Sequence, residues 1–140
     1  MARILLVDDD EDFLLLMSEY LESIGLEYDL AVSAEQARNR LEHSGYDIVV
    51  SDFNMPGESG LDLLRHVSSR YPEIQFVLLT GYDDPRVRRE ALRMGVHAYI
   101  QKPFYMNELW PPIINLLRRN DQEGFKPPGP SSSPVAATCP

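Results

Sequence analysis

Short apolar runs alternate with stretches of helical spacing five times between residues 3 and 119. Four runs read as buried strands, at residues 4–7, 48–51, 76–79 and 98–101. A weaker, half-polar run at 27–31 has the character of an edge strand. Strands that alternate with helices are typical of a parallel sheet with helices on both faces. The pattern therefore predicts a doubly wound α/β domain with a five-stranded parallel sheet and five helices.

Capping residues and glycines indicate where the first four helices begin and end. The first is expected over about 11–24, with Asp10 as its cap, Gly25 after its end and an apolar face of Phe13, Met17, Tyr20, Leu21 and Ile24. The second should begin at Ser33, with Gln36 as the return half of a capping box, and run to about His43. The third follows Ser59-Gly60, and the fourth runs from Asp84-Pro85 to Gly95.

The fifth helix contains a conflict. Leu109, Ile113, Leu116 and Leu117 have helical spacing, yet Pro111-Pro112 lies among them. Because a proline in a helix interior costs about 3 kcal/mol and one in the first turn costs little, we expect a late start with Asn107 or Trp110 as the cap, or else a kink.

The last twenty residues differ from the rest. Residues 121–140 contain five prolines, two glycines and three consecutive serines, with few large apolar groups. Such a segment buries too little apolar surface to offset the entropy lost on ordering. We therefore expect a folded domain over 1–120 and a disordered tail or interdomain linker over 121–140.

Charge and composition exclude several classes of protein. With 13 basic and 22 acidic side chains, the net charge is -9 and the pI about 4.7, so direct binding to nucleic acid is not expected. The single cysteine, Cys139, can form neither an internal disulfide nor a metal site. Neither a leader pattern nor a membrane-spanning run is visible, so we expect a cytoplasmic protein without a membrane partner.

Polar side chains follow four of the predicted strands. Asp8 and Asp9 follow the first, Asp52 the third, Thr80 the fourth and Lys102 the fifth. The carboxyl ends of parallel strands share one edge of the sheet, where such folds bind ligands. Three carboxylates that close require a cation, and an all-oxygen carboxylate set suits Mg²⁺.

A phosphoryl group on Asp52 would fit the charge of this cluster. The modified side chain carries roughly -2 and Asp8 with Asp9 another -2, against +2 from the metal and +1 from Lys102. Thr80 could donate its hydroxyl to a phosphoryl oxygen, and Gly81 leaves room for that oxygen to approach.

These motifs resemble one family. The order Asp8-Asp9, Asp52-Phe53-Asn54-Met55-Pro56 with Gly60, Thr80-Gly81 and Tyr99-Ile100-Gln101-Lys102-Pro103-Phe104 is similar to the receiver domain of two-component response regulators, over residues 2 to about 119. The resemblance implies a flavodoxin-like fold with strand order 2-1-3-4-5. It also implies that the chain works as a phosphorylation-dependent signalling domain and not as an enzyme on outside substrates.

The resemblance also assigns roles to residues. Asp52 would accept a phosphoryl group from a sensor histidine kinase or phosphotransfer protein, and Lys102, joined to Pro103 by a cis peptide, would pair with it. Asp9, Asp52 and the carbonyl of Asn54 would bind Mg²⁺, with Asp8 acting through a water. Thr80 and Tyr99 would form a switch that alters the face of the fourth helix, fifth strand and fifth helix, which contacts a downstream protein or effector domain.

Two other functions use the same residues. A Mg²⁺-dependent phosphohydrolase would share the aspartyl-phosphate chemistry, but the second acid that such enzymes carry two residues after the nucleophile is Asn54 here. A pseudo-receiver scaffold would need no chemistry, yet every chemical position is occupied. Pro111-Pro112 departs from the family pattern and puts dimerisation through the last helix in doubt. Whether the chain stands alone or is part of a longer regulator stays open.

Two further sets of side chains can be explained by packing or by exposure to solvent. The three histidines, His43, His66 and His97, share no ligand spacing and are expected at the surface or in packing. Four arginines at 86, 88, 89 and 93 on the fourth helix fit either a docking patch or a solvated helix face.

Overall fold

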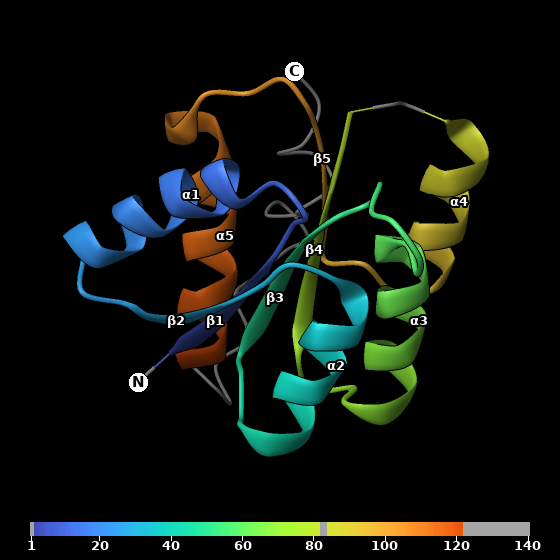
Figure 1. The fold of residues 1–140 in the computed structure, drawn as a ribbon, viewed down its shortest axis with the longest axis horizontal. Helices are drawn as coiled ribbons and strands as arrows, with labels where there is room; N and C mark the ends of the chain where they lie inside the picture. Colours follow the sequence, from blue (N-terminus) through green and yellow to red (C-terminus); the bar gives the residue numbers. More distant parts are fainter. Residues whose placement is uncertain (1, 82–83, 122–140) are drawn as a thin grey trace.

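A five-stranded parallel sheet forms the centre of the molecule, in a computed structural model that describes residues 2–81 and 84–121 (Figure 1). Its strands are β1 (Arg3–Val7), β2 (Glu27–Ala31), β3 (Ile48–Asp52), β4 (Gln75–Thr80) and β5 (Ala98–Gln101), in the order β2-β1-β3-β4-β5. All four pairings are parallel. The predicted fold class and strand order are confirmed.

Within the described residues, five helices cover the two faces of the sheet. They are α1 (Glu11–Ser23), α2 (Ala34–His43), α3 (Gly60–Arg70), α4 (Pro85–Arg93) and α5 (Met106–Asp121). Helices α1 and α5 lie on one face, and α2, α3 and α4 on the other (Figure 1). Side chains alternate across each strand, so Leu5, Val49 and Phe76 pack under α2 to α4, whereas Ile4, Val50 and Val77 pack under α1 and α5. Burial of both faces explains why the central strands are almost continuously apolar.

The observed helix caps agree in part with those predicted from the sequence. Asp10 accepts a hydrogen bond from the Phe13 N–H, as predicted for α1. Ser33 Oγ accepts from the Gln36 N–H, but the Gln36 side chain bonds to the Val32 N–H, so the expected return to Ser33 is wrong by one residue. A full capping box occurs instead at α3, between Ser59 and Asp62. An aspartate replaces the usual glutamate there, which hides the motif in the sequence.

Ile24 is the one exposed member of the predicted α1 face. It is 44% exposed, because α1 ends at Ser23 and the chain turns away at Gly25, whose φ of 76° is left-handed. Leu14, Met17 and Leu21 form the buried stripe instead. The helical period alone does not show that the chain has left the helix before its last apolar residue.

Helix α5 begins earlier than predicted. It starts at Met106 and includes Pro111 and Pro112 in its interior, so the expected caps at Asn107 or Trp110 are wrong. The Tyr105 carbonyl accepts the first helical bonds, and the Tyr105 N–H donates to Glu108 Oε1 at 2.8 Å. Burial of an apolar stripe offsets the helix stability that the two prolines remove. The fully or almost fully buried side chains of this stripe are Leu109, Trp110, Ile113, Leu116 and Leu117.

Two further expectations concern membrane-spanning helices and the C-terminal tail. In the part of the chain that the structure describes, none of the helices has the length and apolar character to cross a membrane. The predicted tail at 121–140 falls, except for its first residue, outside the described residues, so the boundary near residue 120 stays a prediction.

Candidate functional site

Three carboxylates meet at the carboxyl edge of the sheet. Asp8 follows β1, Asp9 comes next, and Asp52 is the last residue of β3. One oxygen from each lies within 4.8 Å of one from each of the others. Asp8 and Asp52 are 1% and 6% exposed, whereas Asp9 faces solvent. Parallel pairing of β1 with β3 brings together residues that are more than forty positions apart in the chain.

Lys102 joins this cluster from the loop after β5. Its Nζ lies 2.9 Å from Asp52 Oδ1 and 3.5 Å from Asp8 Oδ2. The Lys102 N–H donates to the Thr80 carbonyl at 2.7 Å, which fixes the start of the loop to the end of β4, and the Lys102–Pro103 peptide bond is cis. Sequence positions 8, 52 and 102 thus form one ion-pair group, in which the two carboxylates are buried and the lysine is half-buried.

Burial and like charge weaken the acidity of the two buried carboxylates. Burial, together with the charges of Asp52 and Asp9, raises the pKa of Asp8 to about 6, although the Asp10 N–H donates to Asp8 Oδ1 at 2.9 Å. Burial also raises the pKa of Asp52, and Lys102 opposes that shift. Burial disfavours the ammonium of Lys102, but its hydrogen bond and charge attraction to Asp52 outweigh this and raise its pKa. One lysine therefore leaves the three carboxylates short of positive charge.

The donor set fits a divalent cation. Asp8 Oδ2 is buried and accepts no hydrogen bond from the described residues, its one charged contact being the 3.5 Å pair with Lys102. The negative charge of the buried carboxylate oxygens is not fully paired, and an exposed carboxylate lies beside them. Such a site suits a hard cation that keeps several waters, as Mg²⁺ does. The acidic pocket can therefore bind a metal ion.

An aromatic ring lies beside the lysine ammonium, a contact that the sequence did not indicate. The ring centroid of Phe13, on α1, lies 4.7 Å from Lys102 Nζ, and the Phe104 ring lies 6.0 Å from that of Phe13. Both rings are half-buried. A cation over an aromatic face is attracted by the quadrupole of the ring. Only the tertiary structure reveals this contact, because Phe13 was assigned to the core face by its spacing.

A hollow opens beside Asp52, between the ends of β3 and β4. It is lined by Phe53, Asn54, Thr80 and Gly81. Asn54 is exposed there, whereas Thr80 is 1% exposed at the end of β4. The Phe53 N–H donates to the Leu79 carbonyl at 2.7 Å, so the loop that carries Asn54 is held against β4. This hollow has the place and polarity to receive a small anion bound to Asp52.

Tyr99 lies on β5, on the face of the sheet that α3 and α4 cover. It is 1% exposed, so its ring is already inside the protein. The Arg88 guanidinium carbon of α4 lies 5.1 Å from the ring centroid. Thr80 and Tyr99, the two predicted switch residues, therefore come from adjacent strands, and Tyr99 also contacts α4.

The loop after β3 approaches α3 very closely at Gly60. A Cβ there would lie 2.2 Å from the Asp52 carbonyl oxygen and 2.9 Å from both Leu78 Cδ1 and Phe53 Cα. The Gly60 N–H donates to the Phe53 carbonyl at 2.8 Å. Only glycine permits this approach, which holds the Asp52 backbone against the start of α3.

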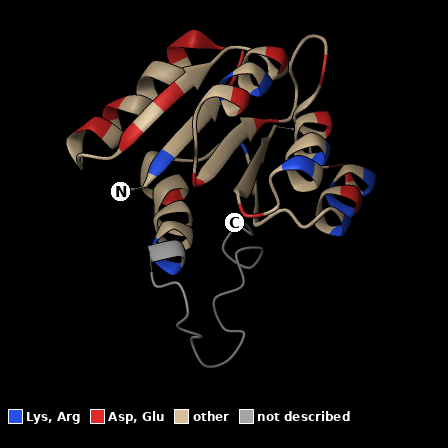
Figure 2. Ribbon diagram, turned by 90° about the horizontal axis from the view of Figure 1, so that it is seen from below, with Lys and Arg blue, Asp and Glu red and all other residues tan. Residues whose placement is uncertain are grey.

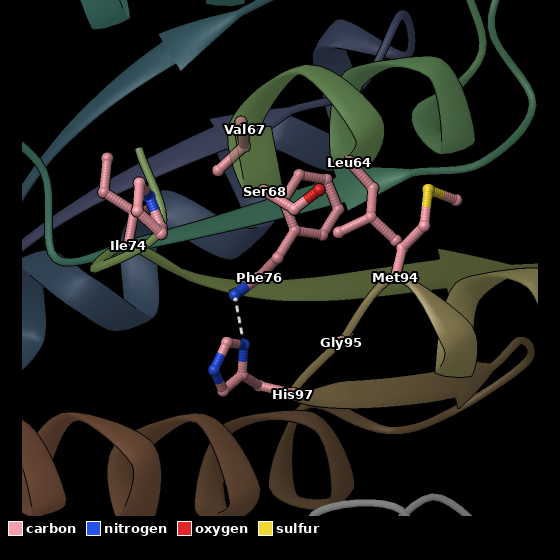
Figure 3. Close-up of a pocket in the computed structure, with 9 residues that line it drawn as sticks. Leu64, Val67, Ser68, Ile74, Phe76, Met94, Gly95 and His97 are labelled. Carbon is pink, nitrogen blue, oxygen red and sulfur yellow. Dashed lines mark hydrogen bonds between the residues drawn. The ribbon is translucent and has the colours of Figure 1, made fainter. Parts of the chain in front are cut away.

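A second hollow lies at the opposite edge of the sheet and contains none of these groups. It has a volume of about 240 Å³ and is lined by Leu64 and Val67 of α3 and by Phe76, Met94 and His97 (Figure 3). The Phe76 N–H donates to His97 Nδ1 at 3.1 Å (Figure 3). His97 is therefore a packing histidine, as expected, and burial lowers its pKa.

The other two histidines also pack against neighbouring residues or lie at the surface. The His66 ring lies edge-on to Tyr71 with centroids 6.0 Å apart, and His43 Nδ1 contacts the Asn39 carbonyl at 2.8 Å. Among the described residues, the only group of acidic, histidine or cysteine side chains close enough to hold a metal is Asp8, Asp9 and Asp52.

Known proteins share this arrangement. Residues 4–113 match the family model described as the response regulator receiver domain. The response regulator protein FleR of Pseudomonas aeruginosa is 35% identical over 135 residues, which cover 96% of this chain and 28% of that protein. The transcriptional regulatory protein RprY of Bacteroides fragilis is 35% identical over 84% of this chain and 50% of its own length. The chain thus spans half or less of these curated relatives.

Solved structures agree in fold and sequence. A CheY-like receiver domain from Methanospirillum hungatei has a TM-score of 0.84 and 29% identity, over 89% of this chain and 99% of its own. The response regulator TrrA from Thermotoga maritima, in complex with Mg(2+)-BeF, has a TM-score of 0.75 and 32% identity, over 83% of this chain and 99% of its own. The match does not favour the phosphohydrolase or the pseudo-receiver alternative. The chain therefore belongs to the response regulator receiver domains of two-component signalling systems.

Proposed function

We propose that Asp52 is the phosphoacceptor and that it takes its phosphoryl group from the phosphohistidine of a sensor histidine kinase or phosphotransfer protein. The observation that carries this is the ion pair between the buried Asp52 Oδ1 and Lys102 Nζ at 2.9 Å, beside two further carboxylates. Because Lys102 holds Oδ1, we assign the attack on phosphorus to Oδ2. The new O–P bond forms as the N–P bond breaks, and the electron pair of that bond returns to the imidazole nitrogen.

The same carboxylates would hold Mg²⁺. Asp9 and Asp52 would contribute carboxylate oxygens and Asn54 its backbone carbonyl, while Asp8 would act through a water. When bound, Mg²⁺ supplies positive charge that offsets the carboxylates and the incoming phosphoryl oxygens. The TrrA structure, by its title, contains Mg(2+)-BeF, which supports the same ligand class here.

Lys102 and Thr80 would bind the phosphoryl group after transfer. The modified Asp52 gains negative charge, so the ammonium that pairs with Asp52 Oδ1 would move its hydrogen bond to a phosphoryl oxygen. The Thr80 hydroxyl, at the hollow beside Asp52, would donate to another oxygen. Hydrolysis of the acyl phosphate would be a property of the domain itself, without a second carboxylate at position 54 to speed it.

The output would pass through Tyr99 and α4. Turning Thr80 toward the phosphoryl group favours the inward position that the Tyr99 ring occupies at 1% exposure. Loss of the phosphoryl group would let the ring visit outward positions, and Arg88, which contacts the ring, would carry that change to α4. The face formed by α4, β5 and α5 would then control a partner protein or an effector domain. The curated relatives, which are longer, support an effector as one form of the output.

A chemical donor tests the assignment without the cognate kinase. The chain is incubated with Mg²⁺ and a small acyl phosphate, and labelling is followed by intact mass and by mapping of the modified residue. We expect one phosphoryl group on Asp52, lost on treatment with hydroxylamine, and none in Asp52→Asn. The exposed Asp12, on α1, is a matched control, and Asp12→Asn should be labelled as the native chain is. Full labelling of Asp52→Asn at another residue would contradict the proposal.

A further inference from the structure

Helix α4 carries the opposite charge to the chain as a whole. The chain has a net charge of -9, yet the nine residues of α4 include four arginines and one glutamate. Figure 2 shows basic positions gathered on the side of α3 and α4, whereas acidic positions dominate α1 on the other side. A local excess of one sign of charge attracts partners of the opposite sign.

Three of these arginines form an outward line. Arg86, Arg89 and Arg93, here called the α4 arginine stripe, are spaced by three and four residues and so share one face of the helix. All three are exposed, and the side chains of Arg86 and Arg93 are 86% and 66% accessible. Leu92, 42% exposed, lies next to Arg93 in the sequence.

Acidic residues of the same helix do not neutralise the stripe. Arg86 lies 3.5 Å from the capping Asp84, and Arg93 lies 3.5 Å from Glu90. Exposed pairs of this kind contribute little, because water and salt screen them. The arginine side chains therefore keep most of their capacity to bind further carboxylates, including the paired, fork-shaped contacts that guanidinium groups favour.

The inner side of the helix fixes the stripe in place. Arg88 turns inward, with its guanidinium carbon 5.1 Å from the centroid of the buried Tyr99 ring, and Ala91 is fully buried. The stripe lies on the other side of the same helix. A change at Tyr99 would therefore move the helix that carries the three arginines.

Charge also limits which partner fits. A symmetric contact between two copies through α4 would bring the same basic surface together on both sides, with Glu90 already paired. A nucleic acid would meet a chain with a net charge of -9. An acidic protein segment meets neither obstacle, and an apolar side chain on it could cover Leu92.

We propose that the α4 arginine stripe is the docking site for an acidic segment of a partner protein. Carboxylates of the segment pair with Arg86, Arg89 and Arg93, and an apolar residue between them covers Leu92. Binding itself requires only the stripe, and its control by phosphorylation rests on the proposed function of Asp52.

A labelled synthetic peptide tests the proposal on the full chain. The probe carries glutamates at three- and four-residue spacing with interspersed leucines, and a second peptide carries glutamine in place of each glutamate. Binding is measured by fluorescence anisotropy, and amide NMR shifts locate the site. We expect the glutamate peptide to bind more tightly than the glutamine peptide, with shifts centred on α4 and weaker binding as salt increases.

Two triple variants with equal loss of charge identify the site. Arg86→Gln with Arg89→Gln and Arg93→Gln should raise the Kd by roughly tenfold. Arg65→Gln with Arg70→Gln and Arg118→Gln, all at exposed positions on α3 and α5, should leave it within about twofold. Equal Kd values for both triple variants, equal binding of both peptides, or self-association of the chain that the α4 variant abolishes would overturn the proposal.

Labelling of Asp52 on the same samples separates this inference from the proposed function. If an acyl phosphate labels Asp52 but the glutamate peptide does not bind, the docking site is wrong and the phosphoacceptor stands. If the peptide binds through α4 but Asp52 is not labelled, the phosphoacceptor is wrong and the docking site stands.

Discussion

At the scale of residues, a single substitution can test the contact between the Phe13 ring and Lys102. Its centroid lies 4.7 Å from Lys102 Nζ, which in turn lies 2.9 Å from Asp52. A cation over a partly exposed ring is stabilised by about 0.5–1 kcal/mol, which corresponds to roughly a two- to fivefold change in an equilibrium or rate. Phe13→Leu keeps an apolar side chain but removes the ring. We expect it to slow labelling of Asp52 by an acyl phosphate about two- to fivefold.

Phe13→Tyr is the conservative control for this prediction, because it retains the aromatic face. It should label at the native rate. An unchanged rate in Phe13→Leu, or an equal loss in both variants, would show that the ring does not position Lys102.

At the scale of elements, the close approach of α3 to β3 depends on one glycine. A methyl group at Gly60 would lie 2.2 Å from the Asp52 carbonyl oxygen, which is backbone and has no free rotation to relieve the clash. We expect Gly60→Ala to lower the free energy of unfolding by roughly 1–3 kcal/mol or more, measured by urea denaturation. Gly45→Ala is the matched control, since its Cβ would meet no atom within 4 Å. It should be neutral or slightly stabilising.

In helix α5, by contrast, we expect one substitution to increase stability. Pro111 is exposed and lies in the interior of the helix, where it has no N–H for the Asn107 carbonyl. Pro111→Ala restores that donor, while the unfolded chain gains freedom that offsets part of the benefit. We expect a net gain of about 1 kcal/mol in the free energy of unfolding, since alanine is favoured over proline by roughly 3 kcal/mol within a helix. A loss of stability in urea would mean that the proline ring packs productively.

The sequence predicted elements well where a single local rule decides them. Alternation of strands and helices, the Asp10 cap and the glycine at position 25 all follow from local chemistry. The start of α5 was missed because burial of Leu109, Trp110 and Ile113, a tertiary effect, outweighs the local preference against proline. The carboxylates and Lys102 could be grouped from strand ends alone. The Phe13 contact with Lys102 and the close approach at Gly60 could not, because both depend on how α1 and α3 pack against the sheet.

At the scale of the whole molecule, the acidic edge of the sheet sets part of the stability of the domain. Asp8 is almost fully buried, and its pKa of about 6 lies above the ordinary value of 3.8, so its charged form is less stable in the folded than in the unfolded chain. Above pH 6 this difference destabilises the metal-free fold, and it fades as the pH falls toward 4. In a chelator at pH 7.5, Asp8→Asn should therefore raise the free energy of unfolding by roughly 1–3 kcal/mol. The gain in Asp8→Asn relative to the native chain should shrink at pH 5.

Addition of Mg²⁺ should raise the melting temperature of the native chain more than that of variants that lack a proposed ligand. A cation that binds the folded domain and not the unfolded chain stabilises it by mass action, by about 2.7 kcal/mol at a hundred times its Kd. The native chain and the exposed control Asp12→Asn should both gain melting temperature with Mg²⁺ and lose it again when a chelator is added. Asp9→Asn and Asp52→Asn, each without one proposed ligand, should gain much less. An equal Mg²⁺ response in all four proteins would place the cation elsewhere, whereas loss of the response in the two ligand variants alone would locate it at the carboxyl edge of the sheet, where Asp52 and Lys102 meet.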